Sequence, residues 1–171
     1  IRLVGTAQTP RAVGVRQPEM DVTSALQTYA RGVAEHIQDL CGFIFKKDSP
    51  SCGMARVKIY NHSGMPERTG TGLFAREIMR ADPLLPVEEE GRLNDPVLRE
   101  NFIQRVFVLH RWQALEAAGL SKAALIDFHA AHKLVLMAHH QAEAKTLGRL
   151  IAHLDGRRLR IWLEVGHRLD G

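Results

Sequence analysis

The stretch that decides the fold is residues 41–53, which read CGFIFKKDSPSCG. Its aromatic and β-branched residues 43–45 predict a short strand buried on both faces. The serines, proline and glycine of residues 49–53 indicate a turn immediately afterwards. In open α/β sheets ligands gather at the carboxyl ends of strands, so the side chains expected at a site are Lys46, Ser49, Ser51 and Cys52.

The turn contains Cys52, and the position of this cysteine in the sequence alone leaves two interpretations open. A lone cysteine is more often a small buried hydrophobic residue than a ligand or a nucleophile. The surrounding motif favours the second interpretation, because Lys-x-x-Ser-Pro-Ser-Cys-Gly after an apolar strand resembles the signature of the thiouracil desulfidase family. This resemblance extends from Ile1 to about Trp112 and includes residues 56–60, 70–75, 85–96 and 98–103.

The resemblance implies a [4Fe-4S] cluster held by three cysteines, of which Cys52 matches the last. The other two cysteines and an acidic residue would precede Ile1, so we expect an N-terminally truncated fragment without an intact cluster. Three thiolates leave one iron open to bind the sulfur of a thiolated uracil as a Lewis acid, while water attacks the carbon. Ser49 and Ser51 are expected to hydrogen-bond the cluster sulfurs or the base, and Lys46 to favour the thiolate.

A second resemblance begins beyond residue 112. The motif Phe128-His129-x-x-His132-Lys133, followed by Leu136-Met137-Ala138-His139, is similar to a helical domain of the YbgA type. Fusions of these two domains resemble the desulfidases that remove sulfur from 4-thiouridine in transfer RNA. His129 and His132 are expected on one helix face, with His139 two turns further along. Packing or RNA contact is favoured over a metal site, because no carboxylate is placed to complete one.

The composition indicates a protein of a reducing compartment. Two cysteines among 171 residues make no disulfide scaffold, and the first residues do not resemble a signal peptide, so a cytoplasmic location is expected. Cys41 is not expected to serve as a cluster ligand, because a strand rising about 3.3 Å per residue separates it from Cys52. Apolar stretches in the helical region are far shorter than the roughly 20 residues that span a bilayer, so no membrane role is expected.

The basic charge lies in the C-terminal part. Residues 1–96 hold 12 Lys plus Arg and 12 Asp plus Glu, whereas residues 97–171 hold 11 and 7, which accounts for the net charge of +4. A basic helical module beside a neutral α/β module suits a protein that binds phosphates with one part and reacts with the other, although a solvated basic surface fits the charge equally well. The cations expected to contact RNA are Arg105, Arg111, Lys133, Lys145 and Arg149.

The remaining patterns predict an α/β fold with a partial Rossmann-like parallel sheet, followed by an all-α domain. Strands are expected at residues 1–4, 12–15, 56–60 and 84–87, and an amphipathic helix at residues 22–40. Gly70 and Gly72 precede a helix at residues 73–80; their amides would suit an anion, but a tight loop requires the same glycines. At least two of the carboxylates at residues 88–90 are expected to be solvated.

Helix signals organise the C-terminal part. Asp95 and Pro96 predict a helix start, Gly119 its end, and Ser121 the next start. Two further helical pieces are expected at residues 142–154 and 159–169. We therefore predict a desulfidase-like domain at residues 1–96 and an incomplete YbgA-type helical domain at residues 97–171.

The predicted function is iron–sulfur dependent desulfuration of thiolated uracil, with 4-thiouridine in transfer RNA as the expected substrate. The alternatives are a non-catalytic RNA-binding module and a protein-interaction module. The sequence leaves the oligomeric state open, as well as the choice between free base, nucleotide and transfer RNA.

Overall fold

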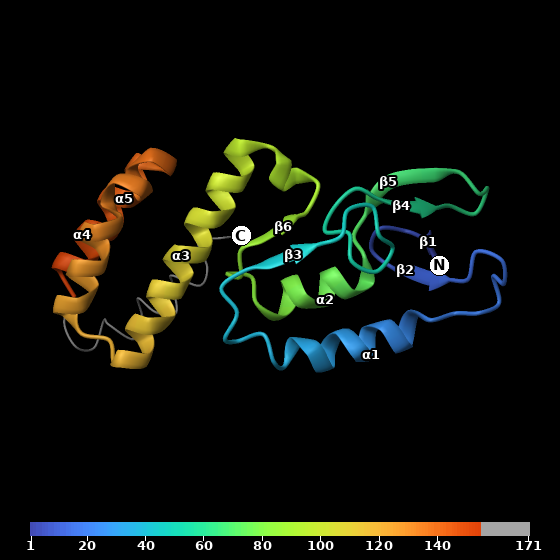
Figure 1. Cartoon of the computed structure of the whole chain (residues 1–171), viewed down its shortest axis with the longest axis horizontal. Helices are drawn as coiled ribbons and strands as arrows, with labels where there is room; N and C mark the ends of the chain where they lie inside the picture. Colours follow the sequence, from blue (N-terminus) through green and yellow to red (C-terminus); the bar gives the residue numbers. More distant parts are fainter. Residues whose placement is uncertain (155–171) are drawn as a thin grey trace. The chain divides into compact units, whose positions relative to one another are not determined.

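The computed structural model describes residues 1–154, and the chain divides into two units, Ile1–Val106 and Phe107–Gly171. The first unit contains all the described strands, and the described part of the second is helical, which confirms the predicted fold class (Figure 1). The predicted domain division at residue 96 coincides with the start of helix α3 (Pro96–Ala118), which continues into the second unit. The helical piece predicted at residues 159–169 lies outside the described residues.

A four-stranded sheet of order β2-β1-β4-β5 lies in the first unit. Strand β1 (Arg2–Gly5) pairs antiparallel with β2 (Pro10–Val13) and parallel with β4 (Val57–Tyr60), and β4 pairs antiparallel with β5 (Pro66–Gly70). The sheet is therefore mixed, and not parallel throughout as predicted. The reason is that short connections join β1 to β2 and β4 to β5, and a short hairpin connection makes its two strands antiparallel.

The strand that precedes Cys52 belongs to a second, two-stranded sheet. Strand β3 (Phe43–Phe45) pairs in parallel with β6 (Val87–Glu89), and Phe45 lies opposite Glu89. Phe45 is 2% exposed but Ile44 is 54% exposed, so the prediction of a strand buried on both faces is wrong. Only one face is covered: Phe43 packs against Phe45 and against Phe74, with ring centroids 4.7 and 6.1 Å apart.

Two helices, α1 (Thr23–Ala34) and α2 (Leu73–Ala81), lie side by side in the first unit (Figure 1). Helix α1 ends earlier than the predicted residue 40. At its end the Gly32 carbonyl lies 2.9 Å from the His36 Nδ1, and the His36 amide donates to the Val33 carbonyl and not to the Gly32 carbonyl, as it would in a continuing helix. The apolar core between the four-stranded sheet and the helices consists of Leu3, Ala12, Val57, Ile59 and Leu73.

The helix boundaries after the sheet follow their predicted signals. A short 3₁₀ turn, η1 (Arg92–Asn94), precedes α3, and the Asp95 carboxylate accepts the Val97 amide at 2.8 Å. Gly119 ends α3 with a φ of +92°, and the Ser121 hydroxyl caps α4 (Lys122–His139) by accepting the Ala124 amide at 3.2 Å.

The second unit continues with α5 (Gln141–Ala152), which packs against α4. The core of the second unit consists of Leu125, Ile151 and Leu154, and Trp112, Leu115 and Leu120 pack against it. Among the described helices, none is long and apolar enough to cross a membrane.

Candidate functional site

The Cys52 loop, residues 46–56, connects β3 to β4 and is held by its own hydrogen bonds. The Ser49 hydroxyl accepts the Cys52 amide at 3.1 Å, and the Ser49 carbonyl accepts the Gly53 amide at 2.8 Å. Asp48 and Arg56 both have a φ of +56°, and they are the two non-glycine residues with positive φ in the described chain. Such a conformation costs about 1 to 2 kcal/mol per residue, so the described backbone strain lies at the two ends of this loop.

Three of the predicted site side chains form a hydrogen-bonded chain that ends on the Cys52 sulfur. The Ser49 and Ser51 hydroxyls are 3.1 Å apart, and the Ser51 hydroxyl is 3.2 Å from the Cys52 Sγ. Because the Ser49 oxygen already accepts the Cys52 amide, its hydrogen is available for Ser51, which can then donate to the sulfur. The Cys52 thiol is half-buried and forms no disulfide.

The first turn of α2 binds the same loop through hydrogen bonds. The amides of Phe74 and Ala75 donate to the Ser51 carbonyl at 2.9 and 3.1 Å, and the Gly72 amide donates to the Gly53 carbonyl at 2.8 Å. A Cβ on Gly72 would lie 2.3 Å from the Ser51 oxygen. The amides of residues 72–75 are therefore engaged by protein carbonyls, which favours the tight-loop interpretation of Gly72 over an anion site.

Two of the three consecutive carboxylates on β6 and after it are buried, so the expectation that at least two are solvated is wrong. Glu88 and Glu89 are 7% and 4% exposed. The Glu88 carboxylate is bound by Arg92 at 2.6 Å, and the Glu89 carboxylate accepts the Met54 amide at 3.0 Å. The sequence contained a signal for the first contact, because Glu88 and Arg92 are four residues apart, but none for the second, which depends on the path of the loop.

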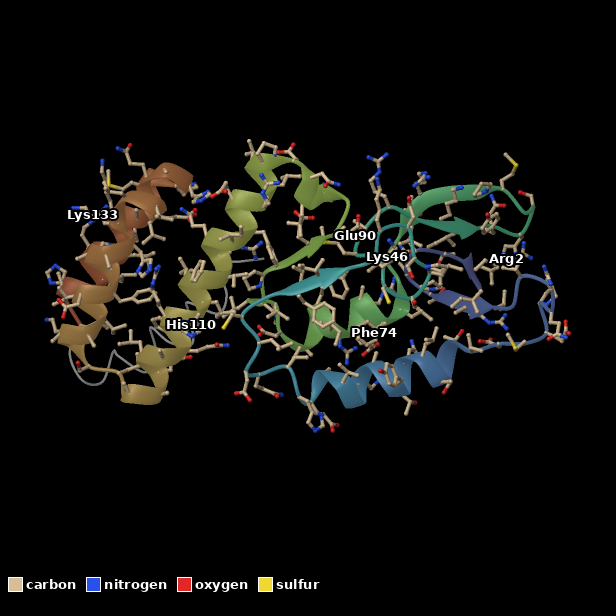
Figure 2. The ribbon with its side chains drawn as sticks, in the orientation of Figure 1. Arg2, Lys46, Phe74, Glu90, His110 and Lys133 are labelled. Carbon is tan, nitrogen blue, oxygen red and sulfur yellow. The ribbon has the colours of Figure 1, made fainter. Side chains whose placement is uncertain are left out.

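Lys46 lies beside Glu90 (Figure 2), and its ammonium group is 2.6 Å from the Glu90 carboxylate. The Lys47 amide donates to the other carboxylate oxygen at 2.7 Å. The hydrogen bond between the two side chains raises the pKa of Lys46 and is the main cause that lowers the pKa of Glu90. The described contact of Lys46 is therefore with Glu90, and its influence on the Cys52 thiolate stays a prediction.

The Cys52 side chain is suited to be one ligand of an iron–sulfur cluster, because cluster thiolates accept hydrogen bonds and the Ser51 hydroxyl lies within hydrogen-bond distance of this half-buried sulfur. In the part of the chain that the structure describes, no three His, Cys, Asp or Glu side chains gather to hold a metal ion. The loop therefore fits a single cluster ligand, and a complete set needs further thiolates.

The histidines of the second unit take part in helix packing. The His132 Nδ1 is 2.8 Å from the Phe128 carbonyl, and its Nε2 is 3.4 Å from an Arg111 nitrogen, so Nδ1 carries the hydrogen and Nε2 accepts. The His129 Nε2 lies 3.2 Å from the Ala144 carbonyl and thereby ties α4 to α5. His139 is exposed at the C-terminal end of α4.

A basic groove lies between α4 and α5, and its volume is about 540 Å³. Lys133 of α4 (Figure 2) and Lys145 and Arg149 of α5 line it, as do His129 and His153. Three of the five cations predicted to contact RNA therefore share one surface. Of the other two, Arg111 contacts His132 and lies 5.9 Å from the centre of the Phe107 ring, and Arg105 is exposed on α3 in the first unit.

Comparisons with known proteins identify the family of this chain. The uncharacterized protein YbgA of Escherichia coli (strain K12) is 42% identical over 50 residues, which are 29% of this chain and 30% of that protein, so the match spans less than a third of that relative. No solved structure matches the chain significantly. A family model described as 2-thiouracil desulfurase matches residues 1–90, a segment that contains the whole Cys52 loop and both sheets. Because this match covers more than half of the chain, the protein belongs to the 2-thiouracil desulfurase family.

Proposed function

We propose that this chain is part of an iron–sulfur dependent desulfurase that replaces the thiocarbonyl sulfur of a thiolated uracil with oxygen from water. One observation carries the proposal: the Cys52 Sγ lies 3.2 Å from the Ser51 hydroxyl in a loop anchored on α2, within the segment that the family model matches. The reaction balances as a hydrolysis. Water supplies the carbonyl oxygen and two hydrogens, the carbon–sulfur bond breaks, and sulfide leaves without any change in oxidation state.

The residues of the loop have separate tasks in this proposal. Cys52 would bind a [4Fe-4S] cluster, which supplies an open iron that attracts the thiocarbonyl sulfur. Ser51 would donate its hydroxyl hydrogen to the Cys52 thiolate and so fix the orientation of the sulfur. Ser49 accepts the Cys52 amide and lies within hydrogen-bond distance of the Ser51 hydroxyl. Because the sequence holds two cysteines and Cys41 lies before β3, the proposal requires further thiolates from outside this sequence.

The test is a pair of cysteine variants in the full-length protein, reconstituted anaerobically with iron and sulfide. Cys52→Ala should lose both the visible iron–sulfur absorbance and the release of sulfide from thiouracil. Cys41→Ala is the matched control, and it should keep both. A Cys52→Ala protein with a normal spectrum and rate would show that the loop does not hold a cluster.

We infer further that the substrate is 4-thiouridine in transfer RNA, and that the groove between α4 and α5 binds RNA phosphates. The groove brings Lys133, Lys145 and Arg149 together, and within the described residues none of the three forms an ion pair. A thiolated base in folded RNA must be reached in a loop or removed from its stack, which costs a few kcal/mol. Phosphate contacts in the groove would offset that cost.

The second test removes two groove charges and compares two matched charges elsewhere. Lys133→Ala with Arg149→Ala should weaken transfer RNA binding and make the negative slope of log affinity against log salt shallower by about 1.5. Lys58→Ala with Arg80→Ala removes two exposed cations of the first unit, and the slope should change less. Turnover of free thiouracil should be unchanged in both. Equal loss on RNA and on the free base would contradict RNA docking, whereas RNA binding without any sulfide release would favour the non-catalytic module.

A further inference from the structure

We propose that Glu89 is a positioning residue for the Cys52 loop: its buried carboxylate holds the Met54 amide and thereby determines where the Cys52 sulfur lies. The inference rests on the proposed function only in treating Cys52 as the ligand that must be positioned. Neither the family match nor the YbgA relative assigns a role to this carboxylate.

The geometry connects the end of one strand to the loop that follows its neighbour. Glu89 is the last residue of β6, and it lies opposite Phe45, the last residue of β3, from which the Cys52 loop departs. One carboxylate oxygen of Glu89 accepts the amide of Met54, two residues beyond Cys52, at 3.0 Å. The side chain therefore fastens the far part of the loop to the strand beside its starting point.

The partner of Glu89 differs from the partners of Glu88 and Glu90. Glu88 is bound by Arg92 and Glu90 by Lys46, each at 2.6 Å. Glu89 is the least exposed of the three. No described cation lies within ion-pair distance of its carboxylate, and at longer range it interacts with Arg92, the ion-pair partner of Glu88. A buried carboxylate needs hydrogen-bond donors, and the described donor that reaches Glu89 is the Met54 amide.

The loop has a second anchor that does not depend on Glu89. The Ser51 carbonyl accepts two amides from α2. When the Glu89 contact is lost, the loop should therefore stay docked at Ser51 and at Gly53, whose carbonyl accepts the Gly72 amide, while Met54 gains freedom that loosens the surroundings of the Cys52 side chain. The change should be local to Cys52 and should not reach Cys41, which lies before β3.

The experiment measures the alkylation rate of each cysteine by iodoacetamide in the metal-free protein, resolved by peptide mass spectrometry. Glu89→Ala should accelerate alkylation of Cys52 by about three- to tenfold, the factor that corresponds to one lost hydrogen bond, and leave Cys41 unchanged. Glu89→Gln should restore a rate near that of the wild type, because an amide oxygen can accept the same Met54 hydrogen. Glu89→Asp keeps the charge but withdraws the acceptor, so it should accelerate Cys52.

Three results would overturn the proposal: an unchanged Cys52 rate in Glu89→Ala, equal acceleration of both cysteines in Glu89→Asp, or a Glu89→Gln rate equal to that of Glu89→Asp or Glu89→Ala. If Glu89→Ala does not fold, the Gln and Asp variants decide the question by themselves. Because no cluster and no substrate are needed, a failure here leaves the desulfurase proposal standing. A Cys52→Ala protein that keeps its cluster would overturn that proposal and leave this one intact.

Discussion

Replacing Gly72 with alanine should destabilise the first unit, although the same change elsewhere is favourable. A Cβ at Gly72 would lie 2.3 Å from the Ser51 carbonyl oxygen and 2.7 Å from the Cys52 nitrogen, which is about 1 Å short of an ordinary contact. Both neighbours are backbone atoms, so the loop and α2 must separate. The φ of Gly72 is −60°, which alanine adopts readily, so the objection is steric and not conformational.

The expected magnitude follows from the contacts that the methyl group would displace. Overpacking of this kind costs about 1 to 3 kcal/mol. The separation also weakens the bonds from Phe74 and Ala75 to the Ser51 carbonyl, each worth about 0.5 to 1.5 kcal/mol. Alanine recovers up to about 1 kcal/mol by restricting the unfolded chain. We expect Gly72→Ala to lower the free energy of unfolding by about 2 to 3 kcal/mol.

Gly32 provides the matched control. It lies inside α1, and a Cβ built on it meets no atom within 4 Å, so Gly32→Ala should raise the free energy of unfolding by about 0.5 to 1 kcal/mol. Urea unfolding followed by far-ultraviolet circular dichroism measures both changes. Hydrogen exchange should show lost protection at the Phe74 and Ala75 amides only in Gly72→Ala. If the two variants changed stability in the same direction, the description of how the loop docks on α2 would be refuted.

Two further predictions concern stability. Hydrogen bonds from Thr23 and then from Arg11 lower the pKa of Asp21 to about 2, below its unfolded value, so this contribution is present above about pH 4 and lost as the pH falls through 2. The difference in unfolding midpoint between wild type and Asp21→Asn should therefore shrink between pH 4 and 2, and a constant difference would contradict it. Arg56 has a φ of +56°, so Arg56→Gly should raise the free energy of unfolding by up to about 1 kcal/mol, as measured by urea unfolding. Lys58→Gly, in strand β4, should lower it by about the same amount, and a loss in both variants would show that Arg56 is not strained.

The sequence predicted the helix boundaries that depend on residues close to the helix ends. The Asp95 and Ser121 caps depend on side chains that accept amides within three residues, and the Gly119 end depends on the positive φ of a glycine. All three are confirmed. Strand β5 (Pro66–Gly70) was missed, because four of its five residues are exposed and it carries no apolar pattern. Its place in the sheet depends on pairing with β4, which lies earlier in the chain.

In the candidate site, too, contacts between sequence neighbours were predictable and contacts between distant residues were not. The serines beside Cys52 were predicted, because they are neighbours in sequence and bond within one turn. The burial of Glu89 could not be predicted, since its partner, the Met54 amide, lies 35 residues earlier and is brought close by the pairing of β3 with β6. Residues 88–90 therefore had the composition of a solvated surface, but the tertiary structure buries two of the three carboxylates, Glu88 and Glu89.

The most direct test of hydrolytic desulfuration follows the sulfur that leaves the substrate and the water oxygen that replaces it. Full-length protein with its cluster is incubated anaerobically with a thiolated uracil in water enriched in ¹⁸O, and sulfide and the pyrimidine product are quantified together. The proposal predicts one sulfide per substrate consumed and one ¹⁸O in each oxygenated product, with neither formed by Cys52→Ala. Substrate consumption without labelled product, or the same labelling by Cys52→Ala, would contradict hydrolytic desulfuration at the Cys52 loop.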